Sequence, residues 1–271
     1  MLSFTMEFSK KLRKFLFPFV GAIGYRISPT SNIDQVKNFL KTLHPIEFDL
    51  IRVGSESDGG YLVPDDFMDL RYCFSPGVSN NSDLERDLAK RGIPSFLADY
   101  SVEAPPISNE NFRFIKKFVG PISSGNFIEF ESWVSSNSKA GDELILQMDI
   151  EGSEYGSLLS CNREVLKRFR IMIIEFHGLD LLFDSHGFQL IRDCFIKLLQ
   201  DFHVVHIHPN NNDPVRTIQG IGIPSLMEIS FLRKDRIFDS KHATKFPHPL
   251  DHRTVLSKKD FDLPENWYSR Y

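Results

Sequence analysis

The stretch Glu143-Leu-Ile-Leu-Gln-Met-Asp149-Ile-Glu151-Gly-Ser-Glu154-Tyr155 decides the fold class of this chain. An apolar run of strand length ends in three carboxylates around one glycine, and a helical pattern follows. Carboxylates placed where a buried strand leaves the core are costly unless they bind something. In open α/β sheets, ligands bind at the carboxyl ends of the strands. The stretch therefore predicts a strand–turn–helix unit with a ligand site at its turn.

A second strand–turn–helix unit is Arg71-Tyr-Cys-Phe-Ser-Pro-Gly77-Val-Ser-Asn-Asn-Ser-Asp83. Gly77 lets the backbone turn tightly, and the helix after it offers free N–H groups to an anion or a carboxylate. Asp99 ends the next predicted strand, about twenty residues further on, where an acidic residue accepts hydrogen bonds from ribose hydroxyls. The spacing favours a nucleoside ligand. Because the turn lacks the GxGxxG pattern, an ordinary strand–helix turn is the alternative.

Strands and helices alternate through most of the chain, which predicts an α/β fold with a doubly wound, mostly parallel sheet. The expected strands are 71–78, 94–102, 112–119, 143–150, 171–176, 202–208 and 225–233, with a loop at 209–224 joining the last two as antiparallel neighbours. The expected helices are 32–44, 82–91 (capped by Ser82 with Glu85), 127–136, 153–169 and 186–200, and a short hairpin is expected at 51–65. The domain boundaries follow as 1–50 for an N-terminal helical extension, 51–240 for the main domain and 241–271 for an irregular tail packed on it.

The composition and net charge of the chain limit the classes of function that it can have. The 25 phenylalanines and a hydrophobic content of 41% can fill a sizeable core. A net charge of −4 leaves no global basic field, so nucleic acid is not expected as a partner. Three widely spaced cysteines predict no disulfide framework, and a reducing, cytoplasmic location is the default.

The N-terminus carries a basic run, 10–14, followed by an apolar run, 15–25, that Pro18 interrupts. The apolar run is shorter than a bilayer-spanning helix of about 20 residues. A helix packed on the domain is one interpretation, peripheral membrane contact through 10–25 is a second, and a signal or anchor is a third.

Several of these features together resemble the FkbM family of class I S-adenosylmethionine-dependent methyltransferases. The resemblance rests on Met148–Glu154, on Ile173–Glu175, on the Gly77 turn and on Asp99, and it covers roughly 50–235. Asp149 to Gly152 match the family's lysine-isoleucine-aspartate-valine-glutamate-glycine signature, with Gln147 in place of the lysine. Ser75-Pro-Gly77 departs from the family's usual Asp-x-Gly-Ala-Asn turn. The resemblance implies a Rossmann-like class I fold with seven strands and O-methylation of a hydroxyl on a sugar, a glycan precursor or a similar small molecule.

On this interpretation the chain binds S-adenosyl-L-methionine, with Gly77 and the backbone after it at the methionine portion and Asp99 at the ribose. The expected cofactor-binding residues are Gly77, Ser79, Asn80, Asp99, Tyr100, Asp149, Ile150 and Glu151.

Methyl transfer to a hydroxyl also requires that a proton be removed, and a histidine of near-neutral pKa suits that task. The expected catalytic residues are His177, His208 and Asp149, at or just beyond the ends of predicted strands. A divalent cation, Mg²⁺ or Mn²⁺, is the alternative way to activate the hydroxyl, with Asp149, Glu175, His177 and His208 as its predicted ligands. Two other functions stay open: a nicotinamide-dependent oxidoreductase, and a non-catalytic Rossmann-like binding domain. The acceptor and the oligomeric state do not follow from the sequence.

Overall fold

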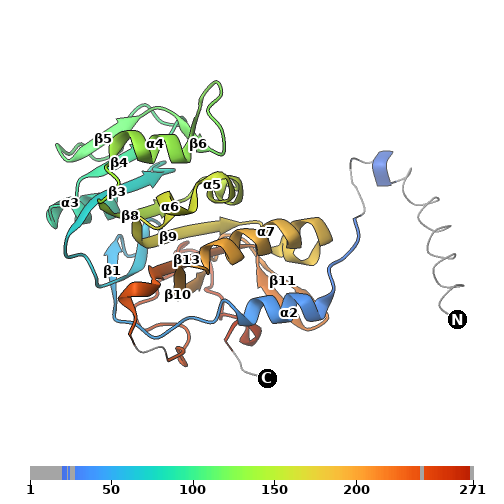
Figure 1. Ribbon diagram of the computed structural model, residues 1–271. Helices are drawn as coiled ribbons and strands as arrows, with labels where there is room; N and C mark the ends of the chain where they lie inside the picture. Colours follow the sequence, from blue (N-terminus) through green and yellow to red (C-terminus); the bar gives the residue numbers. More distant parts are fainter. Residues whose placement is uncertain (1–19, 23, 25–27, 239–240, 269–271) are drawn as a thin grey trace, which may run out of the picture.

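A seven-stranded sheet forms the centre of the computed structural model, which describes residues 20–22, 24, 28–238 and 241–268 (Figure 1). Its strands lie in the order β10-β13-β9-β8-β3-β4-β5. Their bounds are β3 (Leu70–Pro76), β4 (Ser95–Ala98), β5 (Phe112–Ile115), β8 (Glu143–Met148), β9 (Phe169–His177), β10 (Phe202–Pro209) and β13 (Leu226–Arg233). The strands from β5 to β9 pair in parallel, whereas β13 is antiparallel to both β9 and β10. The mixed α/β architecture agrees with a Rossmann-like fold, but the sheet is not purely parallel.

One face of the sheet is covered by helices. These are α4 (Phe130–Asn137), α5 (Glu154–Ser160), α6 (Arg163–Leu166) and α7 (Ser185–Leu198), with α2 (Ile33–Lys41) packed against the same core. Alternate residues of β8, namely Leu144, Leu146 and Met148, are fully buried in this core because successive side chains of a strand point to opposite faces. Helix α2 lies within the range predicted at 32–44. It begins at Ile33 after the N-cap Asn32, whose side chain accepts hydrogen bonds from two backbone N–H groups of the first turn.

The other face is covered by a hairpin and one helix. The hairpin strands are β1 (Leu50–Gly54) and β2 (Gly60–Pro64), and the helix is α3 (Asp83–Lys90). This hairpin was predicted at 51–65, and the segment between its strands includes Asp58-Gly59. Ile145, Ile171 and Ile173 of the sheet pack into this second core. Asp149 and Glu175 follow these isoleucines at even spacing, so their side chains lie on the hairpin side of the sheet.

Several predicted segments differ in the structure. The strand expected at 112–119 divides into β5 and β6 (Phe118–Gly120), because the chain turns at Lys117, whose N–H bonds the carbonyl of Ile115. β6 pairs with β7 (Phe127–Glu129), so the helix expected from 127 begins only at 130. The helix expected at 153–169 is broken between α5 and α6. The loop expected at 209–224 contains a small hairpin, β11 (Val215–Ile218) and β12 (Ile221–Pro224), although β10 and β13 are antiparallel neighbours as predicted.

The predicted cap of α3 is also different. Ser82 occupies the N-cap position, but its side chain makes no capping hydrogen bond. Asn81 Oδ1 instead accepts from the N–H of Asp83 at 2.8 Å. Glu85, expected to complete a capping box, turns inward and is only 3% exposed. This inward carboxylate lines a cavity of the candidate site.

The C-terminal segment from 241 to 268 runs back over the domain and includes the short helix η3 (Glu265–Trp267). Trp267 is fully buried, and its Nε1–H donates to the carbonyl of Gly222 at 3.1 Å. Asp251 accepts a hydrogen bond from His206 Nε2 of β10 at 2.9 Å. The remaining short helices are η1 (Leu179–Phe183) and η2 (Lys234–Arg236).

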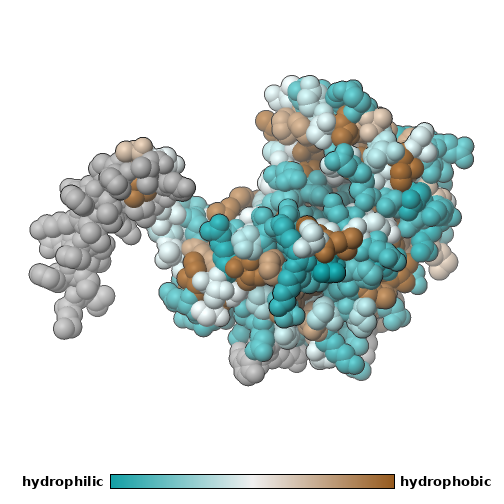
Figure 2. Space-filling view, turned by 180° about the vertical axis from the view of Figure 1, so that it is seen from behind, coloured by the Kyte–Doolittle hydropathy of each residue, from teal (hydrophilic) through white to brown (hydrophobic). Residues whose placement is uncertain are grey.

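Most of the N-terminal run that suggested membrane contact, 10–19 with 23 and 25, lies outside the described residues. Among the residues that the structure describes, no helix has the length and the apolar character needed to cross a membrane. On the face drawn in Figure 2 the surface is mostly hydrophilic, and its hydrophobic residues form separate spots.

Replacing the buried indole should loosen the C-terminal segment. We expect Trp267→Ala to lower the free energy of unfolding by about 3–5 kcal/mol, the usual cost of deleting a buried aromatic side chain. Urea denaturation measures this change. Leu256→Ala in the same segment is the control, since Leu256 is 62% exposed and should change stability by less than about 0.5 kcal/mol. Equal effects of the two substitutions would contradict the anchoring role of Trp267.

Candidate functional site

The ends of β3 and β8 approach each other at Gly77 and Asp149. A Cβ atom on Gly77 would lie 1.5 Å from the carbonyl oxygen of Asp149, and the φ angle of Gly77 is +88°. Only glycine fits this position, because a side chain would overlap the neighbouring backbone and strain its own. The N–H of Asp149 donates to the carbonyl of Pro76 at 3.2 Å. The two predicted strand–turn–helix units therefore meet at one point.

Two non-glycine residues beside this point have left-handed backbone angles. Ser79 has φ +43° and Glu151 has φ +55°. Such conformations are uncommon outside glycine and cluster at ligand-binding turns. The N–H of Ser79 donates to Asp99 Oδ2 at 2.8 Å, which ties the turn after β3 to the end of β4.

A cavity of about 420 Å³ opens at the carboxyl ends of β3, β4 and β8. Its wall includes Gly77, Ser79, Asp99, Ile150 and Glu151, all predicted cofactor-binding residues. Asp99 Oδ1 also accepts hydrogen bonds from the N–H and the Oγ of Ser101, each at 2.7 Å. The Asp99 carboxylate is thus held rigidly at the cavity wall by its own turn. We call this cavity the nucleoside arm of the site.

The nucleoside arm also has an apolar part, which the sequence pattern did not predict. Phe118 and Val119 of β6 and Phe127 of β7 line it. The rings of Phe118 and Phe127 lie 5.4 Å apart between centroids, and Phe118 also packs against Tyr100 at 5.3 Å. Tyr100, a predicted cofactor-binding residue, is 37% exposed beside this wall. Phe118 and Val119 lie near the end of the third predicted strand, and this position in the sequence could have identified them as cavity residues.

A second cavity, of about 190 Å³, shares Gly77, Ser79 and Asp149 with the first. We call it the acidic arm. Its other lining residues are Asp58, Gly59, Tyr61, Val78, Asn80, Asn81, Leu84, Glu85 and Gln147. Asn80 is the predicted cofactor-binding residue among them. The site therefore has two arms that meet above the Gly77 turn.

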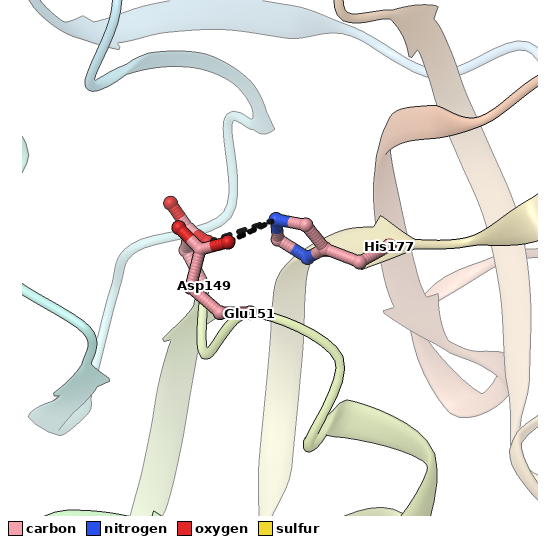
Figure 3. A group of neighbouring side chains, drawn as sticks. All are labelled: Asp149, Glu151 and His177. Atoms are coloured by element: carbon pink, nitrogen blue, oxygen red, sulfur yellow. Dashed lines mark ion pairs between the residues drawn. The ribbon is translucent and has the colours of Figure 1, made fainter. Parts of the chain in front are cut away.

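Asp149, Glu151 and His177 form a compact group beside the junction of the two arms (Figure 3). Each offers an atom that lies within 4.8 Å of the others. His177 Nε2 is 3.7 Å from Asp149 Oδ1 and 3.3 Å from Glu151 Oε2. Asp149 comes from the end of β8 and His177 from the end of β9, so the parallel pairing of these strands brings the group together. Glu175, a predicted ligand, lies at the edge of the group, with Oε1 4.0 Å from His177 Nε2.

Glu154 holds this group in place from inside the protein. Its side chain is fully buried, and Oε1 accepts hydrogen bonds from the N–H groups of Ile150 and Gly152 at 3.0 and 3.2 Å. His177 Nδ1 donates to the same oxygen at 3.1 Å. Nε2 of His177 is therefore left to face Asp149 and Glu151. A carboxylate that orients an imidazole in this way is typical of metal-binding and proton-accepting histidines.

The pKa values of the group reflect burial and mutual repulsion. Burial, together with the charges of Glu151 and Glu154, raises the pKa of Asp149 to about 7, although His177 opposes the shift. Burial and the neighbouring Asp149 carboxylate raise the pKa of Glu175 well above its usual range. Burial lowers the pKa of His177, but the hydrogen bond to Glu154 and the nearby carboxylates outweigh it, so the net pKa is raised.

His208, predicted as a catalytic residue and a metal ligand, lies outside this group. The antiparallel strand β13 is inserted between β9 and β10, so Glu228 of β13 stands opposite both Glu175 and His208. His208 Nδ1 is instead 3.5 Å from Asp251 of the C-terminal segment. Burial lowers the pKa of His208, but Asp251 and Glu228 raise it to a net value of about 9. The structure replaces His208 with Glu151 in the candidate group.

The predicted ligand Glu175 is held by Asn210, which lies in a polar segment after β10. Asn210 is 3% exposed, and its Nδ2 donates to Glu175 Oε1 at 3.1 Å. The Asn-rich sequence 210–212 looks like a solvated turn, and only its buried position in the structure identifies the contact.

Comparisons with known proteins leave the family open. No protein-family model matches the sequence, and no curated protein matches it. A chain of a fibrillarin/Nop5p complex superposes with a TM-score of 0.36 and 11% identity over 61% of this chain and 73% of that chain. A chain of a Pnkp1/Rnl/Hen1 complex superposes with a TM-score of 0.30 and 11% identity over 83% of this chain and 47% of that chain, so this chain spans less than half of its length. The resemblance to the FkbM family therefore rests on the motif residues.

The buried carboxyl group of Glu85 should make stability depend on pH. Burial raises its pKa to about 7, whereas the unfolded chain has the ordinary value of 4.5. The folded state keeps the proton longer, so this group's contribution to stability is lost as pH rises from about 4.5 to about 7. We expect Glu85→Gln to remove that loss and to gain about 3 kcal/mol relative to the wild type between pH 4 and pH 8.

Urea denaturation across that pH range, compared with Glu164→Gln on the surface of α6, tests the prediction. A constant difference between wild type and Glu85→Gln at all pH values would show that folding does not raise the pKa of Glu85.

Proposed function

We propose that this protein is an S-adenosylmethionine-dependent methyltransferase. The observation that carries the proposal is the two-armed cavity at the carboxyl ends of β3, β4 and β8, with Asp99 on one arm, carboxylates on the other and Gly77 between them. Ligands of open α/β sheets bind in this position. The motif resemblance to the FkbM family adds support.

The lining of each arm suits one end of the cofactor. Phe118, Val119 and Phe127 offer an apolar wall to a flat purine, and Asp99 offers carboxylate oxygens to ribose hydroxyls. The carboxylates of the acidic arm suit the positive charges of the cofactor, which lie on its sulfonium and its ammonium group. When bound, S-adenosylmethionine would supply an electrophilic methyl group on a sulfonium. Within the described residues, neither arm is lined by a lysine or an arginine that would repel that positive charge.

We propose that the acceptor is a hydroxyl on which His177 and Asp149 act, and the resemblance to the FkbM family implies that it belongs to a sugar or glycan precursor. A hydroxyl acceptor must lose its proton as the new bond forms, and His177 Nε2 faces the junction of the arms beside Asp149. Glu154 fixes the imidazole so that Nδ1 carries a hydrogen and Nε2 receives the proton. Because the pKa of His177 is raised, its neutral, proton-accepting form becomes the main form only at a pH above the ordinary pKa of histidine.

Binding of S-adenosylhomocysteine is the direct test of this function. We expect calorimetry to show binding, with an increase in melting temperature because the ligand binds the native state. Asp99→Asn should weaken binding by about 1–3 kcal/mol, since hydrogen bonds to an ionised acceptor are lost. Asp193→Asn on the surface of α7 is the matched control and should bind as the wild type does.

A nicotinamide cofactor in the same titration separates the alternatives. Binding of NADH in place of S-adenosylhomocysteine would indicate an oxidoreductase. Binding of neither compound by the folded protein would indicate a non-catalytic domain.

As the alternative to proton removal by His177, we propose that Asp149, Glu151 and His177 hold Mg²⁺ or Mn²⁺. Two carboxylates and one imidazole are a donor set that suits these cations better than a structural zinc, which favours cysteines. The buried Oδ1 of Asp149 makes no hydrogen bond, and Glu154 orients His177 as carboxylates orient metal-bound histidines. The cation would lower the pKa of an acceptor hydroxyl and hold it near Asp149.

Titration with Mn²⁺, followed by electron paramagnetic resonance, tests the metal site without an acceptor. We expect one bound Mn²⁺ in the wild type and at least tenfold weaker binding in Glu151→Gln, as a ligand is lost. Glu164→Gln is the control because the two glutamates are similarly exposed, at 86% and 76% of their side chains. Full methylation after chelation, with no Mn²⁺ bound, would show that His177 acts alone as the base.

A further inference from the structure

The C-terminal segment is fastened to the sheet at Asp251. This side chain is 5% exposed, and one of its oxygens accepts a hydrogen bond from His206 Nε2 at 2.9 Å. The other oxygen accepts from the N–H of His248 at 2.7 Å and lies 3.5 Å from His208 Nδ1. His206 and His208 both belong to β10, so one buried carboxylate joins the segment to the edge strand of the sheet. We call Asp251, His206 and His208 the Asp251 latch.

His208 lies between two buried carboxyl groups. Its side chain is buried, and its Nε2 makes no hydrogen bond within the described residues. Glu228 of β13 stands opposite His208 in the strand register. Thr254 of the C-terminal segment donates to Glu228 Oε1 at 3.2 Å, so Glu228 is also a point of attachment for the segment. Carboxylates on two sides favour the charged form of an imidazole.

The charged and titratable side chains around the latch come from several elements. They include Asp251, His248 and Asp260 of the C-terminal segment, Glu228 of β13, His206 of β10, Tyr61 of β2 and Arg52 of β1. Arg52 acts on both Glu228 and Asp251, but its guanidinium is bonded to the carbonyls of Ser55 and Ser57. Loss of the charge on His208 would therefore leave Glu228 and Asp251 with less positive charge beside them.

The pKa values indicate the pH at which this loss occurs. Burial lowers the pKa of His208, but Asp251 and Glu228 raise it to a net value of about 9, above its ordinary value of 6.5. Burial raises the pKa of Glu228 to about 7, although His208 opposes the shift, so Glu228 ionises before His208 loses its proton. The contribution of His208 to stability is then fully present below pH 6.5 and is lost as pH rises through about 9.

The latch is accessible from one side and borders the candidate site on the other. His206 and His248 line a cavity of about 380 Å³, between 47–50 and 243–249, through which solvent can approach. On the other side, Asn211 Oδ1 accepts from the N–H of Val255 at 2.7 Å. Asn210, the preceding residue, is the one that holds Glu175. The position of the C-terminal segment is thus connected to the edge of the candidate site.

We propose that the Asp251 latch is a pH-sensitive fastening, which holds the C-terminal segment on β10 while His208 is protonated and releases it when His208 loses its proton. The proton passes to solvent, and the two buried carboxylates then repel each other. The latch does not depend on the cofactor that the cavities bind, so it can fail or hold independently of the proposed function.

Hydrogen exchange of the full-length protein, followed by mass spectrometry, tests the latch. We expect the protection of the N–H groups in 248–256, corrected for the chemical exchange rate, to fall about tenfold per pH unit between pH 7 and pH 8.5. Opening releases one proton in that range, which fixes this slope. Protection in β8 should not follow the same slope. Protection of 248–256 that stays constant over this range in the wild type would overturn the latch.

A matched pair of variants assigns the effect to His208. Glu228→Gln, alone and combined with His208→Gln, gives two proteins that differ at one position and in which position 228 cannot titrate. We expect the single variant to keep the fall in protection, at a somewhat lower pH because one carboxylate is lost, and the double variant to show none. The same pH dependence in both proteins would overturn the role of His208.

Nuclear magnetic resonance of the histidine side chains in the wild type is a second measurement, which decides the question even if a variant does not fold. A titration midpoint of His208 near 9 that coincides with the loss of protection supports the latch. A midpoint at or below 6.5, the ordinary value, would overturn it.

Discussion

The buried carboxylate of Glu154 is the constraint on which the candidate site depends. One oxygen accepts hydrogen bonds from the turn that follows β8 and from the imidazole at the end of β9. It therefore couples the left-handed backbone at Glu151 to the orientation of His177, two features that belong to different strands. Tyr155, the next residue, adds a hydrogen bond from its hydroxyl to the carbonyl of His177 at 3.0 Å. A buried residue in the first turn of α5 thus holds both the backbone turn after β8 and the imidazole of His177.

A row of ionisable side chains crosses the sheet. Glu175 of β9, Glu228 of β13 and His208 of β10 lie opposite one another, and Asp149 directly follows β8 beside them, all on the face covered by the β1–β2 hairpin. Burial raises the pKa of the carboxyl groups, and that of Glu228 reaches about 7. A histidine lies near each end of the row: His177 lies beside Asp149 and Glu175, and His208 contacts Asp251.

The sequence predicted the features that depend on strand ends. Gly77, Asp99 and Asp149 converge because parallel strands bring their carboxyl ends to one edge, and a strand pattern is legible in the residues before each. Features that depend on tertiary contacts were missed. The break between α5 and α6 has no glycine or proline, and it is stabilised by Glu131 of α4, which accepts from the N–H of Asn162 at 2.5 Å. Glu85 fits a capping-box pattern in the sequence. In the structure its side chain is instead hydrogen bonded to Ser75 Oγ and lines the acidic arm.

The position of β13 affects how the sheet forms during synthesis of the chain. This strand comes late in the sequence but lies inside the sheet, between β9 and β10. While the chain emerges from the ribosome, β9 keeps one edge with unpaired N–H and C=O groups until 226–233 are available. An unpaired edge is a template for joining other chains, and the apolar residues of β9 make this edge prone to do so. The strand that carries His177 is therefore protected only by the last strand of the domain to be synthesised.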